Sequence, residues 1–423
     1  MRRRVVVTGL GCVTPLGAEV QTLWQRLVEG RSAIGPIALF DAGSFPVQIA
    51  AEVRDWDISD VGEDPQRWKQ EPRQTLFAVA AAKKAVHSAG LEEAPSDPLR
   101  FGVSLGCGET YPDFERFGRL MALAVGGGRF QSETFLRESL TNGYLSCEAP
   151  WEPNLPASYL AGMFDAHGPN ANYTAACVSS SHALGEAADI IRRGEADIML
   201  AGGAHSMIHP FGLTGFHRLS VLSTRNDHTA MRPFDRDRDG FVLGEGAAVV
   251  VLEELKHARK RGAEIWGELT GFGSAQNAFR ITDSHPEGRG ISDCVNRALD
   301  DARLNPDQID YVNAHGTGTV DNDRVETLGL RKVFGDRAYK IPISSTKSMV
   351  GHLTTACGAL DLVVCLMSLR SGVVHPTINY ETPDPECDLD YVPNHAREVS
   401  LKHVLSTSFG FGGQNAALVV SRC

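Results

Sequence analysis

Hydrophobic residues along the chain follow two kinds of pattern. Short apolar runs, such as Val5–Val7, Ala196–Leu200 and Ala247–Leu252, have the length and composition of strands buried on both faces. Longer stretches with apolar residues at helical spacing alternate with them, for example Thr75–Ala89. This alternation predicts an α/β protein with buried strands.

Glycines follow the first apolar run directly. Gly9 and Gly11 predict that the strand begun at Val5–Val7 gives way to a glycine-rich turn. The spacing superficially resembles a dinucleotide-binding fingerprint, but its third glycine would fall at Thr14 and Pro15 follows immediately. A pyrophosphate site is therefore not predicted here.

The length of the chain predicts more than one folding unit. With 423 residues, of which 42% are hydrophobic, it exceeds one ordinary domain of roughly 100–200 residues. A charged helical segment, Glu253–Ala263, separates two halves that we place at 1–255 and 256–423. Thr174–Cys177 and Thr354–Cys357 are similar and both precede helical segments, which suggests duplication; chance similarity of small residues is the alternative.

Charge and cysteine usage narrow the class of protein. A net charge of −11 argues against nucleic acid as the main partner. No stretch approaches the roughly 20 apolar residues of a membrane span. The nine cysteines are odd in number and lack C-x-x-C spacing, so we expect free thiols in a reducing, cytoplasmic location and no metal site.

Cys177 is the best candidate nucleophile. It lies where an extended stretch ending at Tyr173 gives way to small residues with helical spacing. The unpaired N–H groups of a helix start should lower the pKa of the thiol and raise its thiolate fraction. The alternative is a buried cysteine that only packs.

Two histidines stand in similar surroundings. His315 and His352 each follow a strand-like run and lie in loops rich in glycine and hydroxyl side chains. Open α/β sheets build their sites at such strand ends. Together with Cys177, the two histidines indicate catalysis.

A third loop combines glycines with aromatic residues. Phe409, Gly410, Phe411, Gly412 and Gly413 form a run in which glycine lets the backbone turn N–H groups toward a ligand. A tight turn with core phenylalanines is the alternative.

Taken together and in order, these motifs resemble the β-ketoacyl-[acyl-carrier-protein] synthases of the decarboxylating, elongating kind, within the thiolase superfamily. The motifs that carry the resemblance are the Val-Thr-Gly-Leu-Gly start, the Ala176-Cys177 turn, Phe234–Ala247, the His315 loop, Lys347–His352 and the final Phe-Gly-Phe-Gly-Gly. The resemblance implies a thiolase-like duplicated αβαβα layered fold, with a mixed five-stranded sheet in each half.

The resemblance also implies roles for the main residues. Cys177 would carry the acyl group, and the backbone N–H groups of Cys177 and Phe411 would form the oxyanion hole. His315 and His352 would bind the malonyl thioester carbonyl and assist decarboxylation. Lys347 and Glu326 would form an ion pair that supports the histidines.

Further positions are assigned by the same resemblance. Phe409, Gly410, Phe411 and Gly412 match the gating loop, Thr317, Thr319 and Thr282 match substrate-binding positions, and Asp323 joins Glu326 in support. No cofactor is implied, since the substrates carry phosphopantetheine, although a structural monovalent cation is compatible with the family. The implied partners are an acyl carrier protein, a small-molecule acyl chain and a second copy of the chain.

Three functions are compatible with this resemblance. The first is a homodimeric condensing enzyme of fatty-acid elongation, a 3-oxoacyl-[acyl-carrier-protein] synthase. The second is a specialised polyketide or polyene ketosynthase with the same chemistry. The third is a non-catalytic chain-length partner, which should lack the nucleophile or a histidine, whereas this chain has all three.

Some positions depart from the family pattern. The segment Gly106–Leu120 lacks the usual glycine-rich run, which leaves the chain-length preference open. Cys357 stands where a small alanine is usual; a second reactive thiol is one interpretation, and its helical setting favours a packing role. Asn277 and Arg280 replace an acidic residue and a histidine, which leaves the gating partners and carrier docking open.

Overall fold

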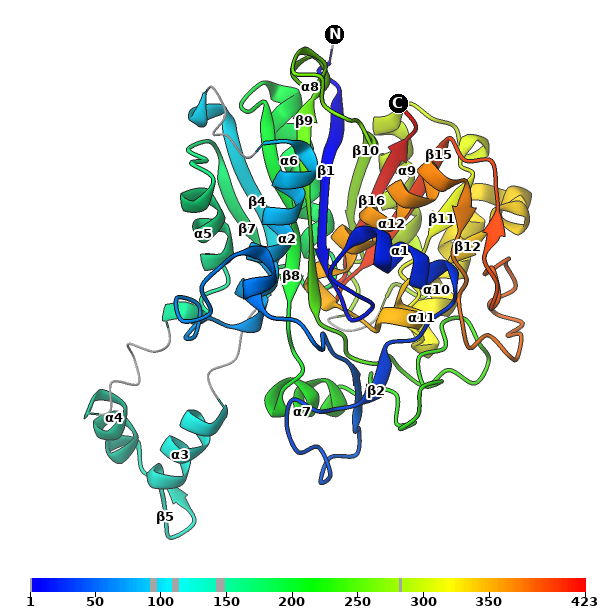
Figure 1. Ribbon diagram of the computed structural model, residues 1–423. Helices are drawn as coiled ribbons and strands as arrows, with labels where there is room; N and C mark the ends of the chain where they lie inside the picture. The colour runs from blue at the N-terminus through cyan, green and yellow to red at the C-terminus, as the bar shows by residue number, and fades with distance from the viewer. Residues whose placement is uncertain (1, 92–96, 109–113, 142–148, 281–283) are drawn as a thin grey trace.

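A computed structural model describes residues 2–91, 97–108, 114–141, 149–280 and 284–423 (Figure 1). Its centre is a ten-stranded mixed sheet in the order β12-β11-β15-β16-β10-β1-β9-β8-β4-β7. The strands are β1 (Val5–Val13), β4 (Phe101–Cys107), β7 (Asn170–Tyr173), β8 (Ile198–His205), β9 (Gly246–Glu254), β10 (Gly267–Gln276), β11 (Tyr311–Asn313), β12 (Ile343–Ser344), β15 (His403–Phe409) and β16 (Gln414–Ser421). Three small antiparallel pairs stand apart from it: β2 (Ile34–Pro36) with β3 (Ile49–Ala51), β5 (Val125–Gly126) with β6 (Arg129–Phe130), and β13 (Val373–Val374) with β14 (Arg397–Glu398).

The sheet consists of two sets of strands with one topology. If the five strands of each half are numbered in chain order, their order from the edge of the sheet to its centre is third, second, fourth, fifth, first in both halves. The two first strands, β1 and β10, pair antiparallel at the centre. In both halves the second strand pairs parallel with the third and fourth, and the other pairs are antiparallel. The repeated order supports duplication, and it confirms the thiolase-like class with two five-stranded halves joined into one continuous sheet.

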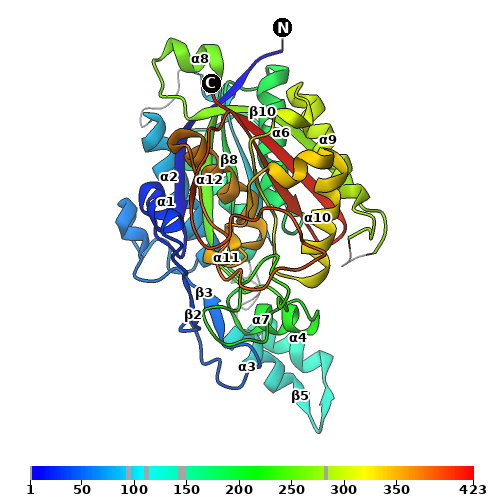
Figure 2. The ribbon, with the colours of Figure 1, turned by 90° about the vertical axis from the view of Figure 1, so that its right-hand side faces the viewer.

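Helices cover the sheet in layers (Figures 1 and 2). They are α1 (Val20–Val28), α2 (Arg73–Ala89), α3 (Phe114–Ala124), α4 (Ser132–Thr141), α5 (Leu155–Met163), α6 (Ser179–Arg193), α7 (Pro210–Arg218), α8 (Leu255–Lys260), α9 (Arg289–Ala302), α10 (Val320–Phe334), α11 (Lys347–Val350) and α12 (Cys357–Ser371). In the middle layer, α6 and α12 contact each other and strands of both halves. Helix α2 covers the outer face of the first half, and α9 with α10 covers that of the second.

Successive residues of a central strand pack into hydrophobic cores on opposite faces of the sheet. Because both faces are buried, the sequence of such a strand is a continuous apolar run. In β9, Val250 and Leu252 pack in the central core with α6 and α12, whereas Val249 and Val251 pack in the core beneath α2. All four side chains are fully buried. Burial on both faces explains why the runs at 196–200 and 247–252 predicted β8 and β9 correctly.

The first strand corrects a prediction. Gly9 and Gly11 do not begin a turn; they lie inside β1, which continues to Val13. A Cβ atom at Gly9 would come within 2.1 Å of the Ala85 carbonyl oxygen, and one at Gly11 within 2.0 Å of the Ala81 carbonyl oxygen. The glycines therefore let α2 approach the strand closely, a use that a sequence pattern does not distinguish from a turn.

The helix in the connection between the two halves is shorter than predicted. Glu253 and Glu254 complete β9, and α8 occupies only Leu255–Lys260 of the predicted charged helix. In the sequence, α8 and the connection that follows it separate the last strand of the first set, β9, from the first strand of the second set, β10. The domain boundary at 255/256 stays a prediction.

Among the described helices, one continuous stretch, Thr354–Ser371, is long and apolar enough to cross a membrane. It includes α12, and 89% of it is buried inside the structure. A core helix passes the same test of length and composition, and this position between the two halves is that of a core helix.

Candidate active site

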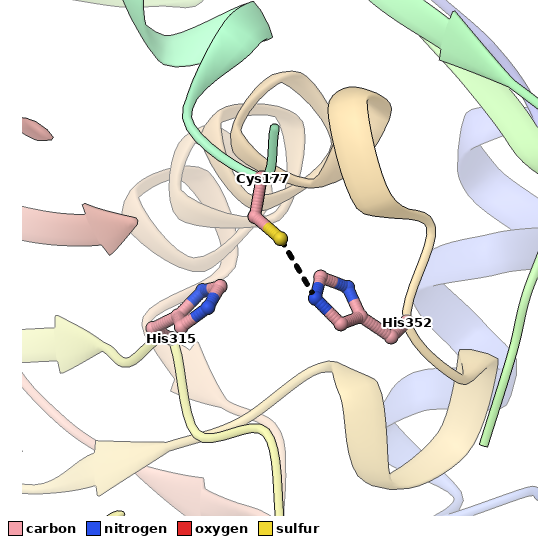
Figure 3. Close-up of side chains that lie close together, drawn as sticks. All are labelled: Cys177, His315 and His352. Carbon is pink, nitrogen blue, oxygen red and sulfur yellow. Dashed lines mark hydrogen bonds between the residues drawn. The ribbon is translucent and has the colours of Figure 1, made fainter. Parts of the chain in front are cut away.

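Cys177, His315 and His352 come together from three separate loops (Figure 3). Cys177 follows β7, His315 follows β11 and His352 follows α11. The thiol points from the turn before α6 toward the two imidazole rings. Its Sγ lies 3.1 Å from Nε2 of His352, and the two ring centroids are 5.5 Å apart. The structure thus brings together the three residues that the sequence analysis singled out, and their catalytic roles stay predictions.

The turn that carries Cys177 is held in an unusual backbone conformation. Ala176 has φ of 48°, in the left-handed region that costs energy for a residue with a Cβ atom. Ser179 stabilises the turn, because its hydroxyl donates to the Ala176 carbonyl at 2.6 Å and accepts from the Ala175 N–H at 2.8 Å. This turn lifts Cys177 clear of α6 and toward the histidines.

Hydrogen bonds settle which nitrogen of His352 carries the proton. The backbone N–H of Thr354 donates to Nδ1 at 3.2 Å, and an amide nitrogen can only donate. In the neutral ring Nδ1 is therefore the acceptor, and Nε2 carries the hydrogen that faces Cys177 Sγ. Phe241 packs edge-on against the ring, with centroids 4.8 Å apart, and fixes its plane.

His315 is anchored through its backbone. Its N–H donates to Glu326 Oε1 at 2.9 Å and to Thr407 Oγ1 at 3.1 Å, and the next residue, Gly316, donates to Glu326 Oε2 at 2.8 Å. The ring packs edge-on against Phe409, with centroids 5.5 Å apart. A buried carboxylate thus shapes the loop, while the imidazole faces the cavity.

Two cavities meet at the thiol. One, of about 260 Å³, is lined by both histidines, Thr317 and Thr319. The other, of about 360 Å³, is lined mainly by apolar or small residues: Ala176, Met207, Gly212, Gly215, Phe216 and Thr355 are among them. Cys177, Leu219 and Phe411 border both. A group attached to Cys177 can therefore extend into the apolar cavity while a second molecule occupies the polar one.

Comparison with known proteins identifies the family of the chain. The sequence-family model for the β-ketoacyl synthase N-terminal domain matches residues 2–258, and the family model for the C-terminal domain matches residues 266–381. The chain belongs to the β-ketoacyl synthase family.

Similar family members include a 3-oxoacyl-[acyl-carrier-protein] synthase and a subunit of a polyketide synthase. The chain is 44% identical to 3-oxoacyl-[acyl-carrier-protein] synthase 2 of Coxiella burnetii, covering 100% of this chain and 99% of that protein. It is 41% identical to the tetracenomycin polyketide synthase ketoacyl synthase alpha subunit of Streptomyces glaucescens, covering 99% and 97%.

Solved ketosynthases have the same fold over the whole chain. A β-ketoacyl synthase from Burkholderia phymatum has a TM-score of 0.88 at 33% identity, covering 100% of both chains. A type II polyketide ketosynthase, solved in complex with its acyl-carrier protein and bound to the hexaketide, has a TM-score of 0.87 at 33% identity, also covering 100% of both.

The buried lysine of this synthase pairs differently from the prediction. Lys347 Nζ lies 3.2 Å from Asp361 Oδ2 on α12, and both side chains are 2% exposed. The predicted Lys347–Glu326 pair is therefore wrong, because Glu326 binds backbone N–H groups of the His315 loop instead. Burial would lower the pKa of Lys347, but Asp361 holds it above its usual value and keeps the ammonium charged.

Asp361 is the main site residue that the sequence prediction missed. It is the one acid in the otherwise apolar stretch of α12, and a charge there needs a partner. That requirement could have identified it, although the sequence alone does not say which cation it meets.

The expected depression of the Cys177 pKa is also wrong. Burial raises the pKa of the thiol to about 11, with Lys347 pulling in the opposite direction. The residue precedes α6, which begins at Ser179, so it does not lie in the first helical turn as predicted. In the free enzyme Cys177 is therefore a thiol, and the His352 Nε2–H group stands ready to stabilise the thiolate as it forms.

Both active-site histidines are held neutral. Burial lowers the pKa of His315 and of His352 well below their usual value, and Lys347 lowers both further. A neutral imidazole can donate through N–H to a developing oxyanion without first losing a proton.

The two buried acidic residues of α10, Glu326 and Asp323, have separate supporting positions. Burial raises the pKa of Glu326 to about 7, against the effect of its three hydrogen bonds. Asp323 accepts from the N–H groups of Phe234 at 2.7 Å and Gly318 at 3.2 Å, and it lies 3.7 Å from Arg238. Asp323 thereby joins the loop after His315 to the segment around Phe234.

The remaining predicted positions border the site. Thr317 and Thr319 share a hydrogen bond of 2.8 Å on the wall of the polar cavity, where Phe409, Gly410 and Phe411 also lie. Gly410 rests against the turn of the nucleophile, because a Cβ there would lie 3.4 Å from the Cys177 nitrogen. Gly412 has φ of 88°, a conformation that favours glycine in this loop. Thr282 lies outside the described residues.

The three catalytic candidates are also close enough to suggest a metal site, since their ligand atoms lie within 4.8 Å of one another. The chemistry of His352 argues against that use. A metal on Nε2 would place the ring hydrogen on Nδ1, where it would point at the Thr354 N–H that this nitrogen now accepts.

Proposed function

We propose that this ketosynthase catalyses decarboxylative Claisen condensation of an acyl thioester, carried on Cys177, with malonyl-acyl carrier protein. The product is 3-oxoacyl-acyl carrier protein. The observation that carries this proposal is the position of Cys177 Sγ, 3.1 Å from His352 Nε2 at the meeting point of a polar and an apolar cavity. Acyl transfer needs the nucleophile, and condensation needs room beside it for a second thioester.

In the first half-reaction the Cys177 sulfur attacks the carbonyl carbon of the acyl thioester. The bond to the carrier thiol breaks, the proton of Cys177 leaves with the carrier sulfur, and the acyl chain occupies the apolar cavity. Because the Nε2–H of His352 faces Sγ, it lowers the energy of the thiolate formed on the way. Backbone N–H groups of Cys177 and Phe411 are the proposed oxyanion hole.

In the second half-reaction a malonyl thioester occupies the polar cavity. Its carbonyl oxygen accepts hydrogen bonds from His315 and His352, the bond to the carboxylate breaks, and carbon dioxide leaves. The electron pair of that bond forms an enolate whose carbon attacks the acyl carbon on Cys177. The tetrahedral intermediate then collapses and expels the Cys177 thiolate, which regains a proton.

The threonine pair at the wall of the polar cavity suits the arm of the carrier. Thr317 and Thr319 offer hydroxyl groups that can bond the amides of phosphopantetheine, the arm on which both substrates arrive. The acyl carrier protein is the proposed partner, and no further cofactor is required by these steps. A structural monovalent cation and a cytoplasmic location stay predictions from the sequence.

A second copy of the chain is the proposed partner of the segment α3–α4. Six large apolar side chains there are between 45% and 68% exposed: Phe114, Leu123, Val125, Phe130, Leu136 and Leu140. Such a concentration in one projecting segment (Figure 1) is typical of a protein interface. Sedimentation of the purified chain tests this expectation, and a monomer would contradict it.

A specialised polyketide ketosynthase is the second candidate function. The comparable identities to a 3-oxoacyl-[acyl-carrier-protein] synthase, 44%, and to a polyketide ketoacyl synthase subunit, 41%, favour neither pathway strongly. Both candidates use the same residues, and they differ in the acyl chain.

Turnover with defined thioesters tests the proposed function. Acyl-carrier protein and malonyl-carrier protein, mixed with the enzyme, should give a 3-oxoacyl product two carbons longer together with carbon dioxide. A preference for saturated chains supports fatty-acid elongation, whereas a preference for poly-oxo or polyene chains supports the second candidate. Absence of product with every chain would contradict both.

A further inference from the structure

Two cysteine sulfurs lie on opposite sides of one imidazole. Cys177 Sγ is 3.1 Å from Nε2 of His352, and Cys357 Sγ is 3.0 Å from Nδ1 of the same ring. Cys357 is 2% exposed and Cys177 is 8% exposed. Cys357 is therefore not simply a small residue filling the core, as its position in an apolar helix predicted.

The Thr354 N–H group shows which partner donates in the hydrogen bond between Cys357 and His352. Nδ1 of His352 already accepts the backbone N–H of Thr354, so this nitrogen carries no hydrogen in the neutral ring. A thiol beside an unprotonated nitrogen can only donate. The S–H of Cys357 therefore points at Nδ1, and the ring receives two donors on the side away from the nucleophile.

We propose that Cys357 is a positioning residue of the condensation reaction, whose thiol donates to Nδ1 of His352 and keeps the Nε2–H directed at Cys177 and the substrate carbonyl. The part of this inference that concerns the substrate carbonyl rests on the proposed function. The part that concerns Cys177 does not. Hydrogen bonds in a chain polarise one another, so donation to Nδ1 also makes the opposite N–H a better donor.

The backbone holds Cys357 in place for this contact. It is the first residue of α12, and the next residue, Gly358, lies so close to α6 that a Cβ there would meet Ser181 Oγ at 1.9 Å. The N–H of Ala359 donates to Ser180 Oγ at 3.1 Å. Since α6 also follows the Cys177 turn, the two sulfurs are positioned by the same pair of packed helices.

The state of the thiol agrees with this role. Burial raises the pKa of Cys357, which keeps the S–H proton in place through the neutral range. The titratable groups around the ring are Cys177 in the turn before α6, His315 in the loop after β11, Lys347 on α11 and His205 on β8. Lys347 is balanced by Asp361, and these groups stay unchanged when only Cys357 is replaced.

Removing the S–H donor should have a defined effect on pH dependence. A donor at Nδ1 competes with a proton for the nitrogen lone pair and so favours the neutral ring. In Cys357→Ala the ring should bind a proton more easily, and the acidic limb of the rate profile should move to higher pH. In Cys357→Ser a hydroxyl donor replaces the thiol, and the profile should return toward that of the wild type.

Decarboxylation of malonyl-pantetheine, followed as carbon dioxide release between pH 5 and 8, tests the proposal. We expect Cys357→Ala to lose roughly three- to tenfold in rate at neutral pH, the size of one modest hydrogen bond. Cys365→Ala is the matched control, because Cys365 is equally buried on α12 and does not line the site. Identical pH profiles for Cys357→Ala and Cys365→Ala would overturn the proposal.

A second measurement separates this inference from the proposed function. Alkylation of Cys177 by iodoacetamide needs no substrate, and the Nε2–H of His352 stabilises the reacting thiolate. The rate should fall in Cys357→Ala, recover in Cys357→Ser and stay unchanged in Cys365→Ala. If the wild type does not decarboxylate malonyl-pantetheine, the proposed function fails, and alkylation still decides the role of Cys357.

Discussion

Lys347 Nζ and Asp361 Oδ2 lie 3.2 Å apart beneath the active site, each with a side chain 2% exposed. Removing one partner from a buried pair leaves the other charge uncompensated. Asp361→Asn should therefore lower the free energy of unfolding by about 3–5 kcal/mol, measured by chemical denaturation. Lys347→Met together with Asp361→Leu should recover much of that loss.

An exposed pair provides the control for this prediction. Arg370 and Glu264 lie 2.5 Å apart, but their side chains are 49% and 55% exposed, so solvent screens them. Glu264→Gln should change stability little. A Glu264→Gln effect equal to that of Asp361→Asn would contradict the account of the buried pair.

The neutral histidines predict how decarboxylation depends on pH. Because the pKa of His315 and that of His352 lie well below the usual value, both rings keep their N–H donors and stay uncharged as the pH falls from 7.5 to 6. The rate of malonyl-thioester decarboxylation should stay nearly constant over that interval. An acidic limb centred near the ordinary histidine pKa of about 6.5 would contradict this expectation.

Replacing either histidine should slow decarboxylation strongly. In His315→Ala or His352→Ala the enolate oxygen loses a preorganised donor, which typically costs roughly 10²–10³-fold in rate. His217→Ala is a suitable control, because His217 lies near the end of α7 and lines neither cavity. Equal rates for all three variants would remove the proposed role of the histidines.

The raised pKa of Cys177 predicts the pH dependence of its alkylation. Since burial raises the pKa to about 11, the thiolate fraction should grow about tenfold per pH unit from neutral pH upward. Iodoacetamide labelling, followed by peptide mass, should still accelerate between pH 9 and 10. Exposed Cys423 in the same sample reports the condition of the reagent. A rate that levels off near pH 7 would indicate the depressed pKa first expected from the sequence.

The apolar cavity predicts which residue limits the acyl chain. Phe216 is half-buried on its wall and packs edge-on against Phe241, with centroids 5.6 Å apart. Phe216→Ala should enlarge the cavity and shift the preferred acyl-carrier substrate toward longer chains. Phe272→Ala removes a half-buried ring that lines neither cavity and should leave the preference unchanged. An identical chain-length profile for both variants would contradict this assignment.

The sequence predicted strands and helices well where one pattern has one structural cause. The apolar run at 247–252 indicated β9, because a strand buried on both faces has few alternatives. Gly9 and Gly11 were misinterpreted, since glycine permits both a turn and the close approach of a helix, and only the position of α2 distinguishes them.

The sequence predicted which residues form the candidate site better than it predicted the contacts between them. Cys177, His315 and His352 were recognised from their loops, but the partner of Lys347 depended on which carboxylate the fold brings near it. The contact between Cys357 and His352 depends on the turn at 353–357, whose geometry no hydrophobic pattern encodes. Desolvation of the Cys177 thiol likewise follows from packing in three dimensions.

Acyl transfer to the nucleophile tests the central claim most directly. The protein should be incubated with an acyl-carrier thioester, without a malonyl substrate, and weighed intact by mass spectrometry. The account predicts a single added acyl group, located by peptide mapping at Cys177, which is absent in Cys177→Ala and present in Cys357→Ala. An acyl adduct that survives Cys177→Ala would contradict the claim.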